Sequence, residues 1–178
     1  ELLKANNERL ADENFVMPYL DPNSEATTVR ALHRALKKYK LPASLIRRAY
    51  RAGLERLQAY HEDVVREGRR ILFAAEKEGK HVVVLAGRPY HADPEINHGI
   101  TKLLNSLGIV VLSEDAVFEE SPLVKVNVLN QWTYHARLYR AAEFVSEREH
   151  ISLVQLVSFG CGIDAITTDE VRSILEKK

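Results

Sequence analysis

Hydrophobic positions follow a helical period in the first part of the chain. Between residues 43 and 78 apolar side chains recur at helical spacing, which predicts a long amphipathic helix. Ser24 stands where a cap is expected, so a shorter helix is predicted over residues 25–39. Turn-forming residues are frequent in residues 1–24, and we expect this N-terminal stretch to be weakly structured.

Near residue 80 the pattern changes to short apolar runs. The first run is rich in valine, as in a strand buried on both faces. Asp93 and Pro94 stand together in the order typical of a helix cap and a first helical position. The predicted elements are strands at 81–86, 109–112 and 151–157, and helices at 94–107, at 125–147 and after a cap at Thr168.

This order of elements predicts an α/β fold. Right-handed crossovers between parallel strands place the first strand between the second and the third, giving strand order 2-1-3. We therefore expect a Rossmann-like three-layer parallel sheet over residues 81–178. Residues 1–80 are expected to form a helical N-terminal segment that either packs on this domain or extends toward parts outside this chain.

Composition and charge exclude several classes of function. The chain has 178 residues and a formal net charge of zero, so neither nucleic acid nor an anionic membrane is expected as a partner. No apolar run approaches the roughly 18 residues of a membrane span. A single cysteine excludes an internal disulfide and favours a reducing, cytoplasmic compartment. The first residues show no signal peptide, and without an initial methionine the chain is expected to be part of a longer polypeptide.

The single cysteine, Cys161, lies between Gly160 and Gly162 directly after the third predicted strand. The carboxyl edge of a parallel sheet is where ligands bind in α/β folds. Cys161 is therefore either a nucleophile activated by His91 or His98, a ligand of a metal or cluster, or an inert thiol. Its position favours a functional role.

The loop after the first strand carries the other candidate residues, and it should meet the Cys161 loop at the switch point of the sheet. We expect Cys161 to lie within about one side-chain length of residues 87–98. An arginine and a helix N-terminus here would suit an anion or an acyl-carrying cofactor. The alternative is structural, with Arg88 paired to Asp93 and the histidines capping carbonyls. The candidate residues of this loop are Arg88, Tyr90, His91, Asp93 and His98.

Two further patterns bear on function. The chain contains neither the dinucleotide-binding GxGxxG motif nor a P-loop, so standard nucleotide sites are not expected. On the helix predicted at 125–147, polar residues at helical spacing would share one face. That face is either solvated or lines a cleft, and its members are Asn127, Asn130, Gln131 and Tyr134.

Several motifs together resemble the large acyl-CoA dehydratase activase-related proteins. The resemblance is strong over residues 81–178 and looser over 40–80. The motifs are Gly87-Arg88-Pro89-Tyr90-His91, residues 93–100, Leu112-Ser113-Glu114-Asp115, Trp132-Thr133-Tyr134-His135, Ser158–Ala165 and Thr167-Thr168-Asp169.

The resemblance implies an iron–sulfur protein of anaerobic metabolism, fused to an ATPase activator module and acting on an acyl-CoA. It implies that Cys161 ligates a cluster, that Gly160 and Gly162 let the cluster approach the backbone, and that Arg88, Tyr90, His91 and His98 line the adjacent cleft. A cluster needs about three or four thiolates, so the other ligands are expected outside this chain, which alone should hold no stable cluster and show no activity. The alternative is a non-catalytic docking module that couples an ATPase to a reductase partner.

Overall fold

The structure is a computed structural model, and it describes residues 15–21, 23–121, 124–158 and 160–176. The chain divides into two units, of which the first ends at Tyr60 and the second begins at His61. This division falls within one helix, α3 (Ala43–Lys77). The predicted domain boundary at residue 80 stays a prediction. The N-terminal stretch predicted to be weakly structured, residues 1–24, lies largely outside the described residues.

The first unit contains the first of the two helices that the hydrophobic pattern predicts and the first part of the second, α3. Helix α2 (Glu25–Ala35) begins after Ser24, whose hydroxyl accepts a hydrogen bond from the Thr27 amide, so the predicted cap is confirmed. The α-helix ends at Ala35 instead of the predicted residue 39, and a 3-10 turn, η1 (Lys37–Tyr39), follows it. This turn is capped by Lys40, which lies in the left-handed region with φ 52°. Within this unit Arg51 of α3 donates two hydrogen bonds to Glu25.

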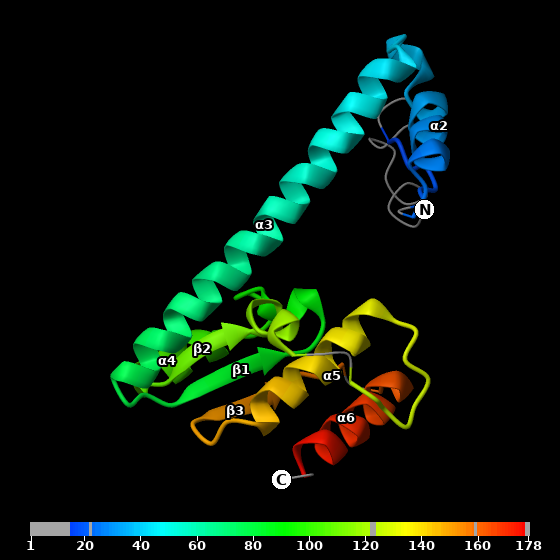
Figure 1. Cartoon of the computed structure of the whole chain (residues 1–178). Coiled ribbons are helices and arrows are strands. Elements are labelled where there is room, and N and C mark those ends of the chain that lie inside the picture. The colour runs from blue at the N-terminus through cyan, green and yellow to red at the C-terminus, as the bar shows by residue number, and fades with distance from the viewer. Residues whose placement is uncertain (1–14, 22, 122–123, 159, 177–178) are drawn as a thin grey trace. The chain divides into compact units, whose positions relative to one another are not determined.

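The second unit is built on a parallel sheet of three strands, β1 (Val82–Ala86), β2 (Val110–Ser113) and β3 (Ile151–Gln155). Figure 1 shows β1 between the other two strands, which confirms the predicted order β2-β1-β3. Val82 is in register with Val110 on one side and with Ile151 on the other. Because every residue of β1 is buried, the unbroken run of apolar residues that marks this strand is explained.

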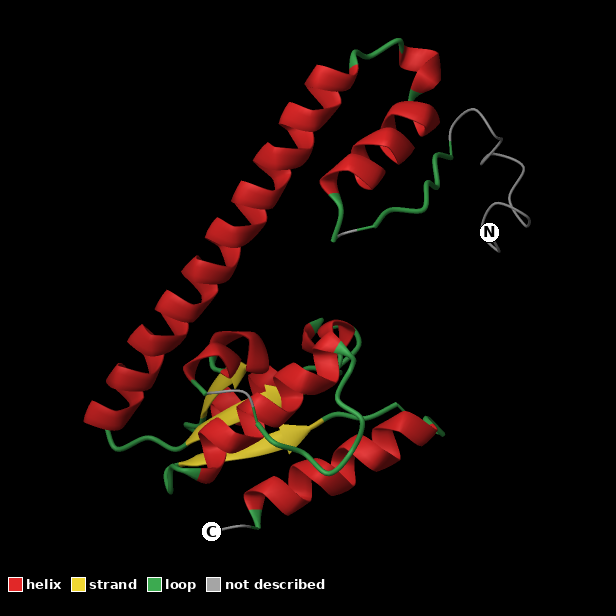
Figure 2. Ribbon diagram, turned by 45° about the vertical axis from the view of Figure 1, so that its right-hand side comes forward, coloured by secondary structure: helices red, strands yellow, loops and turns green. Residues whose placement is uncertain are grey.

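Helices pack against this sheet, as Figure 2 shows, and complete the α/β fold. Val82 and Val84 share a buried cluster with Ala75 of α3 and with Phe144 of α5 (Thr133–Ser146). A second cluster joins α5 to α6 (Gly162–Leu175). Gly68 allows α3 to approach the short turn η3 (Glu114–Ala116), since a Cβ at this position would lie 2.7 Å from the Cβ of Ala116.

The predicted helix over 94–107 is wrong in its first part. Helix α4 (Ile100–Ser106) begins six residues later than Pro94, after a series of turns. The turns end with His98 and Gly99, which have φ values of 53° and 77°, and left-handed residues interrupt an α-helix. The buried side chain of Asn97 reinforces this path by accepting a hydrogen bond from the amide of Gly99 at 3.0 Å.

The predicted helix over 125–147 is also wrong in its first part, because α5 begins only at Thr133. Residues 124–132, which we call the strap, are irregular. Val126 and Val128 of the strap pack against the cluster that α5 and α6 share. The predicted polar face of residues 127–134 therefore does not form on one helix.

The last helix begins earlier than predicted. Cys161 is the residue at the N-cap position of α6, and Thr168 lies inside the helix instead of at its start. The hydroxyl of Thr168 donates to the carbonyl of Asp164 one turn earlier, a bond that a threonine inside a helix commonly forms. The predicted cap at Thr168 is therefore wrong.

Candidate functional site

The candidate site lies where the chain leaves the carboxyl ends of β1 and β3. The amide of Leu156 donates to the carbonyl of Ala86 at 2.8 Å, so the two chains stay paired up to the point where their loops diverge. Gly87 follows with φ 154°. A Cβ here would lie 2.5 Å from Nδ1 of His91 and 2.8 Å from the carbonyl oxygen of Leu156. Glycine is thus required for the β1 loop to turn beside the β3 loop.

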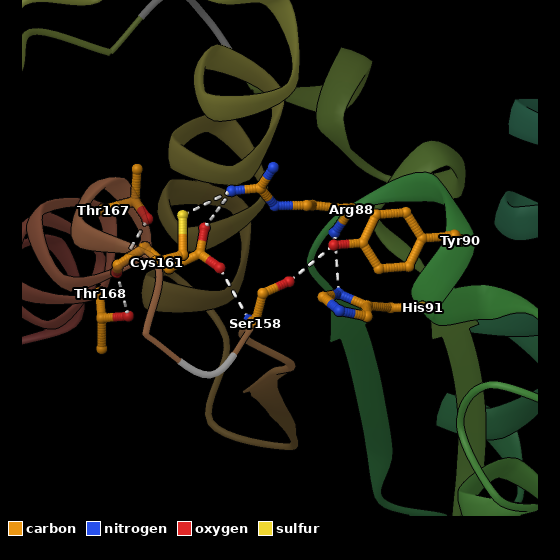
Figure 3. A network of polar contacts seen from close by, with 8 residues as sticks. Arg88, Tyr90, His91, Ser158, Cys161, Thr167 and Thr168 are labelled. Atoms are coloured by element: carbon orange, nitrogen blue, oxygen red, sulfur yellow. Dashed lines mark hydrogen bonds and ion pairs between the residues drawn. The ribbon is translucent and has the colours of Figure 1, made fainter. Parts of the chain in front are cut away.

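Arg88 joins these two loops. Its Nη2 donates to Sγ of Cys161 at 3.0 Å, as Figure 3 shows, and to Oδ1 of Asp164 at 2.8 Å. These contacts confirm the prediction that Cys161 lies within a side-chain length of the loop after β1. The structural alternative, an Arg88–Asp93 pair, is wrong: Arg88 pairs with Asp164, while Oδ1 of Asp93 accepts from the amide of Glu95 at 2.9 Å.

Asp164 binds the β3 loop in addition to binding Arg88. Its second oxygen, Oδ2, accepts from the backbone amide of Ser158 at 2.7 Å. Burial acts to raise the pKa of this carboxyl, but the bonds from Ser158 and Arg88 outweigh burial and the pKa is lowered. Asp164 is therefore ionised near neutral pH and gives Arg88 a fixed counter-charge. Asp164 is not among the candidate residues named from the sequence, where an aspartate near the start of a helix is typical of a turn or cap.

His91 has a structural role in the β1 loop. Its Nδ1 accepts a hydrogen bond from the backbone amide of Arg88 at 3.0 Å, and the side chain is buried within the short 3-10 turn η2 (Pro89–Ala92). Burial lowers the pKa of His91; the charge of Asp164 acts to raise it, and the charge of Arg88 acts in the same direction as burial. A neutral ring with Nδ1 as acceptor fits this geometry. The alternative in which the histidines cap backbone carbonyls does not hold for His91, because its ring accepts a hydrogen bond from a backbone amide.

Tyr90 and His98, the other candidates of this loop, lie in different surroundings. The hydroxyl of Tyr90 lies 2.6 Å from Oγ of Ser158 and gives the β1 and β3 loops a second link. His98 is exposed. Within the described part of the chain the hydrogen-bond partner of the Cys161 sulfur is Arg88, and neither His91 nor His98 bonds to it. The geometry thus gives no support for a thiol activated by histidine.

The structure adds one residue to this neighbourhood that sequence reasoning did not select as a site residue. His135, on the first turns of α5, has its pKa lowered by burial and then by the charge of Arg88, while Asp164 acts in the opposite direction. It therefore lies within electrostatic range of the Arg88–Asp164 pair. The polar residues noted from the sequence around it, Asn127 and Asn130, lie on the strap instead.

The fold and this edge define a Rossmann-like α/β unit in which an arginine, a carboxylate and a thiol meet at the switch point of a parallel sheet. A family model described as CoA enzyme activase uncharacterised domain (DUF2229) matches residues 1–117, and the chain therefore belongs to this family. The matched range contains Arg88, and Cys161 and Asp164 lie beyond it. Searches of curated proteins and of solved structures found no match. Among the described residues there is no helix with the length and apolar character needed to span a membrane.

Proposed function

We propose that this chain is an iron–sulfur-linked component of a CoA enzyme activase system, in which Cys161 provides one thiolate ligand of a cluster. The observation that carries the proposal is the position of the thiol. It lies at the carboxyl edge of the parallel sheet, where such folds bind ligands, and it is paired with an arginine. The system would be cytoplasmic and would act on a 2-hydroxyacyl-CoA or a related thioester.

The surroundings of Cys161 support a ligand role in two respects. A Cβ added at Gly160 or at Gly162 would meet no atom within 4 Å, so the backbone on both sides of the thiol is open to an approaching group. The guanidinium of Arg88 donates to the sulfur, and hydrogen bonds to ligating sulfurs tune the potential of iron–sulfur clusters. Such clusters transfer single electrons.

The donor set of the described residues does not fit a complete cluster. Within the part of the chain that the structure describes, no group of three or more His, Cys, Asp or Glu side chains is placed to hold a metal ion. The remaining ligands would come from other domains of the same polypeptide or from a partner. In this proposal Arg88 and Asp164 position the sulfur, and Tyr90 and His91 hold the loop that carries Arg88.

A docking role is the second candidate function, and exposed apolar side chains around the edge favour it. Val157 of the β3 loop is 50% exposed and Tyr90 of the β1 loop is 45% exposed. In this alternative the edge contacts an ATPase activator module and Cys161 binds no iron.

Anaerobic reconstitution of the polypeptide that contains this chain tests the first proposal. Iron and sulfide content would be measured for the unaltered protein, for Cys161→Ala and for Cys161→Ser, with the exposed Lys102→Ala as the matched control. We expect iron and sulfide in the unaltered protein and in Lys102→Ala, and a clear loss in both Cys161 variants.

A Cys161→Ala protein that keeps its full iron and sulfide would overturn the ligand role, and so would an unaltered protein that takes up no iron. The docking role would then be tested by binding of the ATPase activator module to Val157→Gln, with Leu107→Gln of comparable exposure as its control.

A further inference from the structure

A cavity of about 390 Å³ lies beside α5 and α6, below the strap. This volume falls within the range of small-molecule sites, which is about 300–1,000 Å³. The cavity is lined by residues of the strap and of the first turns of both helices, namely Val128, Leu129, Gln131, Trp132, His135, Tyr139, Ile163, Ile166 and Thr167.

The lining is apolar with a few neutral polar groups. None of its side chains is an Asp, Glu, Lys or Arg. His135 is its one residue that can gain charge near neutral pH, and burial and Arg88 lower its pKa against the opposing effect of Asp164, which favours the neutral ring. Charged ligands need a counter-charge when they leave water, so this lining favours an uncharged ligand.

Two aromatic rings form part of the wall. The centroids of the Trp132 and His135 rings lie 5.0 Å apart, with an angle of 35° between the ring planes. Both residues line the cavity together with Ile163 and Ile166 of α6. Flat rings with branched aliphatic side chains suit a planar aromatic ligand, which gains from ring contacts as well as from burial.

The strap that covers the cavity is fixed at one point by a buried carboxylate. The amide of Asn127 donates to Oε1 of Glu170 at 3.0 Å, and the Glu170 residue is 6% exposed. Val126 and Val128 hold the strap on either side of this bond by packing on the core. The end of the strap nearest α5 is more open, since Leu129 is 82% exposed and Trp132 is 46% exposed. The cavity is therefore preformed, with an open side at Leu129 and Trp132.

We propose that this cavity is a binding site for an uncharged aromatic small molecule, held between the Trp132–His135 rings and the apolar face of α6. The neutral imidazole of His135 and the amide of Gln131 provide a donor and an acceptor for one polar substituent of the ligand. This site adjoins the Arg88–Asp164 pair through His135, but it does not depend on the proposed ligand role of Cys161.

The test uses Trp132, which is the only tryptophan in the chain, so its fluorescence reports on this cavity alone. The probe is N-phenyl-naphthylamine, an uncharged aromatic dye that becomes fluorescent in apolar surroundings and absorbs tryptophan emission. Titration of the full chain should give saturable quenching of Trp132 together with a rise in dye emission. A dye that does not bind, or that binds without quenching Trp132, overturns the proposal.

Matched variants decide whether the dye occupies the cavity. Ile166→Gln places an amide in the cavity wall, whereas Leu103→Gln makes the same kind of change on α4, outside the cavity. Ile166 is 55% and Leu103 is 60% exposed, so both variants should fold. We expect Ile166→Gln to weaken dye binding about fivefold or more and Leu103→Gln to leave it unchanged. Equal effects of the two substitutions would contradict the proposed site.

The charge of the ligand is tested with a matched pair of dyes. Anilinonaphthalene sulfonate has the same two aromatic groups as N-phenyl-naphthylamine and adds one negative charge. The proposal requires that the uncharged dye binds more tightly to this chain. Tighter binding of the sulfonate, with the same dependence on Ile166, would overturn the assignment of an uncharged ligand.

Discussion

Two arginines of the second unit each bind carboxylates, but their surroundings differ. Arg88 pairs with Asp164 at the edge of the sheet, its side chain is 34% exposed, and it also donates to a thiol. Arg137 of α5 pairs with Glu114 and Asp115, and its side chain is 15% exposed. The guanidinium of Arg137 also lies 4.9 Å from the centre of the Phe118 ring. Arg88 thus faces an open edge, whereas Arg137 is enclosed by η3 and the Phe118 ring.

The carboxylates of the two clusters respond differently to burial. Burial raises the pKa of Glu114, and the contacts with Arg137 only partly offset this effect. For Asp164 the bonds from Ser158 and Arg88 outweigh burial, and the pKa is lowered. The Arg137 cluster therefore stabilises packing at a cost in desolvation, while the Arg88 cluster keeps a charged pair next to a sulfur. We infer that the first serves the fold and the second serves the site.

The largest expected effect is a difference in the free energy of unfolding that is lost when each arginine is replaced. Arg137→Met leaves Glu114 buried without its counter-charge and should lower the free energy of unfolding by about 3 kcal/mol. Arg88→Met should cost about 1 kcal/mol or less, because the pair is partly exposed and Asp164 keeps its bond from Ser158. Urea unfolding followed by the fluorescence of Trp132 measures both values. Arg172→Met, on the exposed face of α6, is the control and should stay within about 0.5 kcal/mol of the unaltered chain.

A somewhat smaller effect is expected from the glycines next to the Arg88 cluster. Gly87→Ala forces a Cβ against His91 and the Leu156 carbonyl, and should cost about 2 kcal/mol. Gly162→Ala is the matched control, because its Cβ meets open space at the first helical position of α6, and it should be neutral or slightly stabilising. The same urea experiment checks both variants. Equal costs for the two would mean that the close approach at Gly87 is not what fixes this loop.

The two carboxylates should have opposite effects on the pH dependence of stability. A lowered pKa gives Asp164 a stabilising contribution that is present above its ordinary pKa of 3.8 and is lost as the pH falls through the lowered value. A raised pKa gives Glu114 a contribution that is present below 4.5 and is lost as the pH rises through the raised value.

Relative to the unaltered chain, Asp164→Asn should therefore gain stability toward acid pH, and Glu114→Gln should gain stability toward neutral pH. Urea midpoints measured from about pH 3 to about pH 8 test both trends. If both variants follow the same trend with pH, the claim that the pKa values of the two carboxylates are shifted in opposite directions is contradicted.

The smallest effect concerns the link between the β1 and β3 loops. Tyr90→Phe removes the hydroxyl that lies 2.6 Å from Ser158 Oγ, at an exposed position, and should cost about 0.5 kcal/mol. A double-mutant cycle with Ser158→Ala should give a coupling energy of similar size. Additive effects would show that this contact contributes nothing to the stability of the edge.

The sequence predicts the sheet and the meeting of the two loops because these depend on robust patterns. The valine-rich run of β1 and the right-handed crossover rule together place Arg88 beside Cys161. The partner of Arg88 was not predictable, because Asp93 and Asp164 were both available and the structure pairs Arg88 with the residue 76 positions away.

The predicted starts of α4 and α5 are too early because local contacts override helical propensity. At 94–99 the buried amide of Asn97 bonds to backbone groups and stabilises turns. In the strap, Val124, Val126 and Val128 alternate with polar residues, a period of two that is typical of extended chain. This alternation is the signal that would have excluded a helix over 124–128.

The most direct test of the central claim compares the two arginines by iron retention. Arg88→Met and Arg137→Met would be prepared in the reconstituted polypeptide, and the rate of iron loss to a chelator would be measured under conditions where circular dichroism shows both to be folded. If Arg88 supports a ligating sulfur, Arg88→Met should lose iron about tenfold faster than the unaltered protein, although it is the less destabilised variant. Arg137→Met should lose iron at nearly the unaltered rate. Unchanged iron loss in Arg88→Met, or equal acceleration in both variants, would contradict the claim that the Arg88 cluster is the functional site.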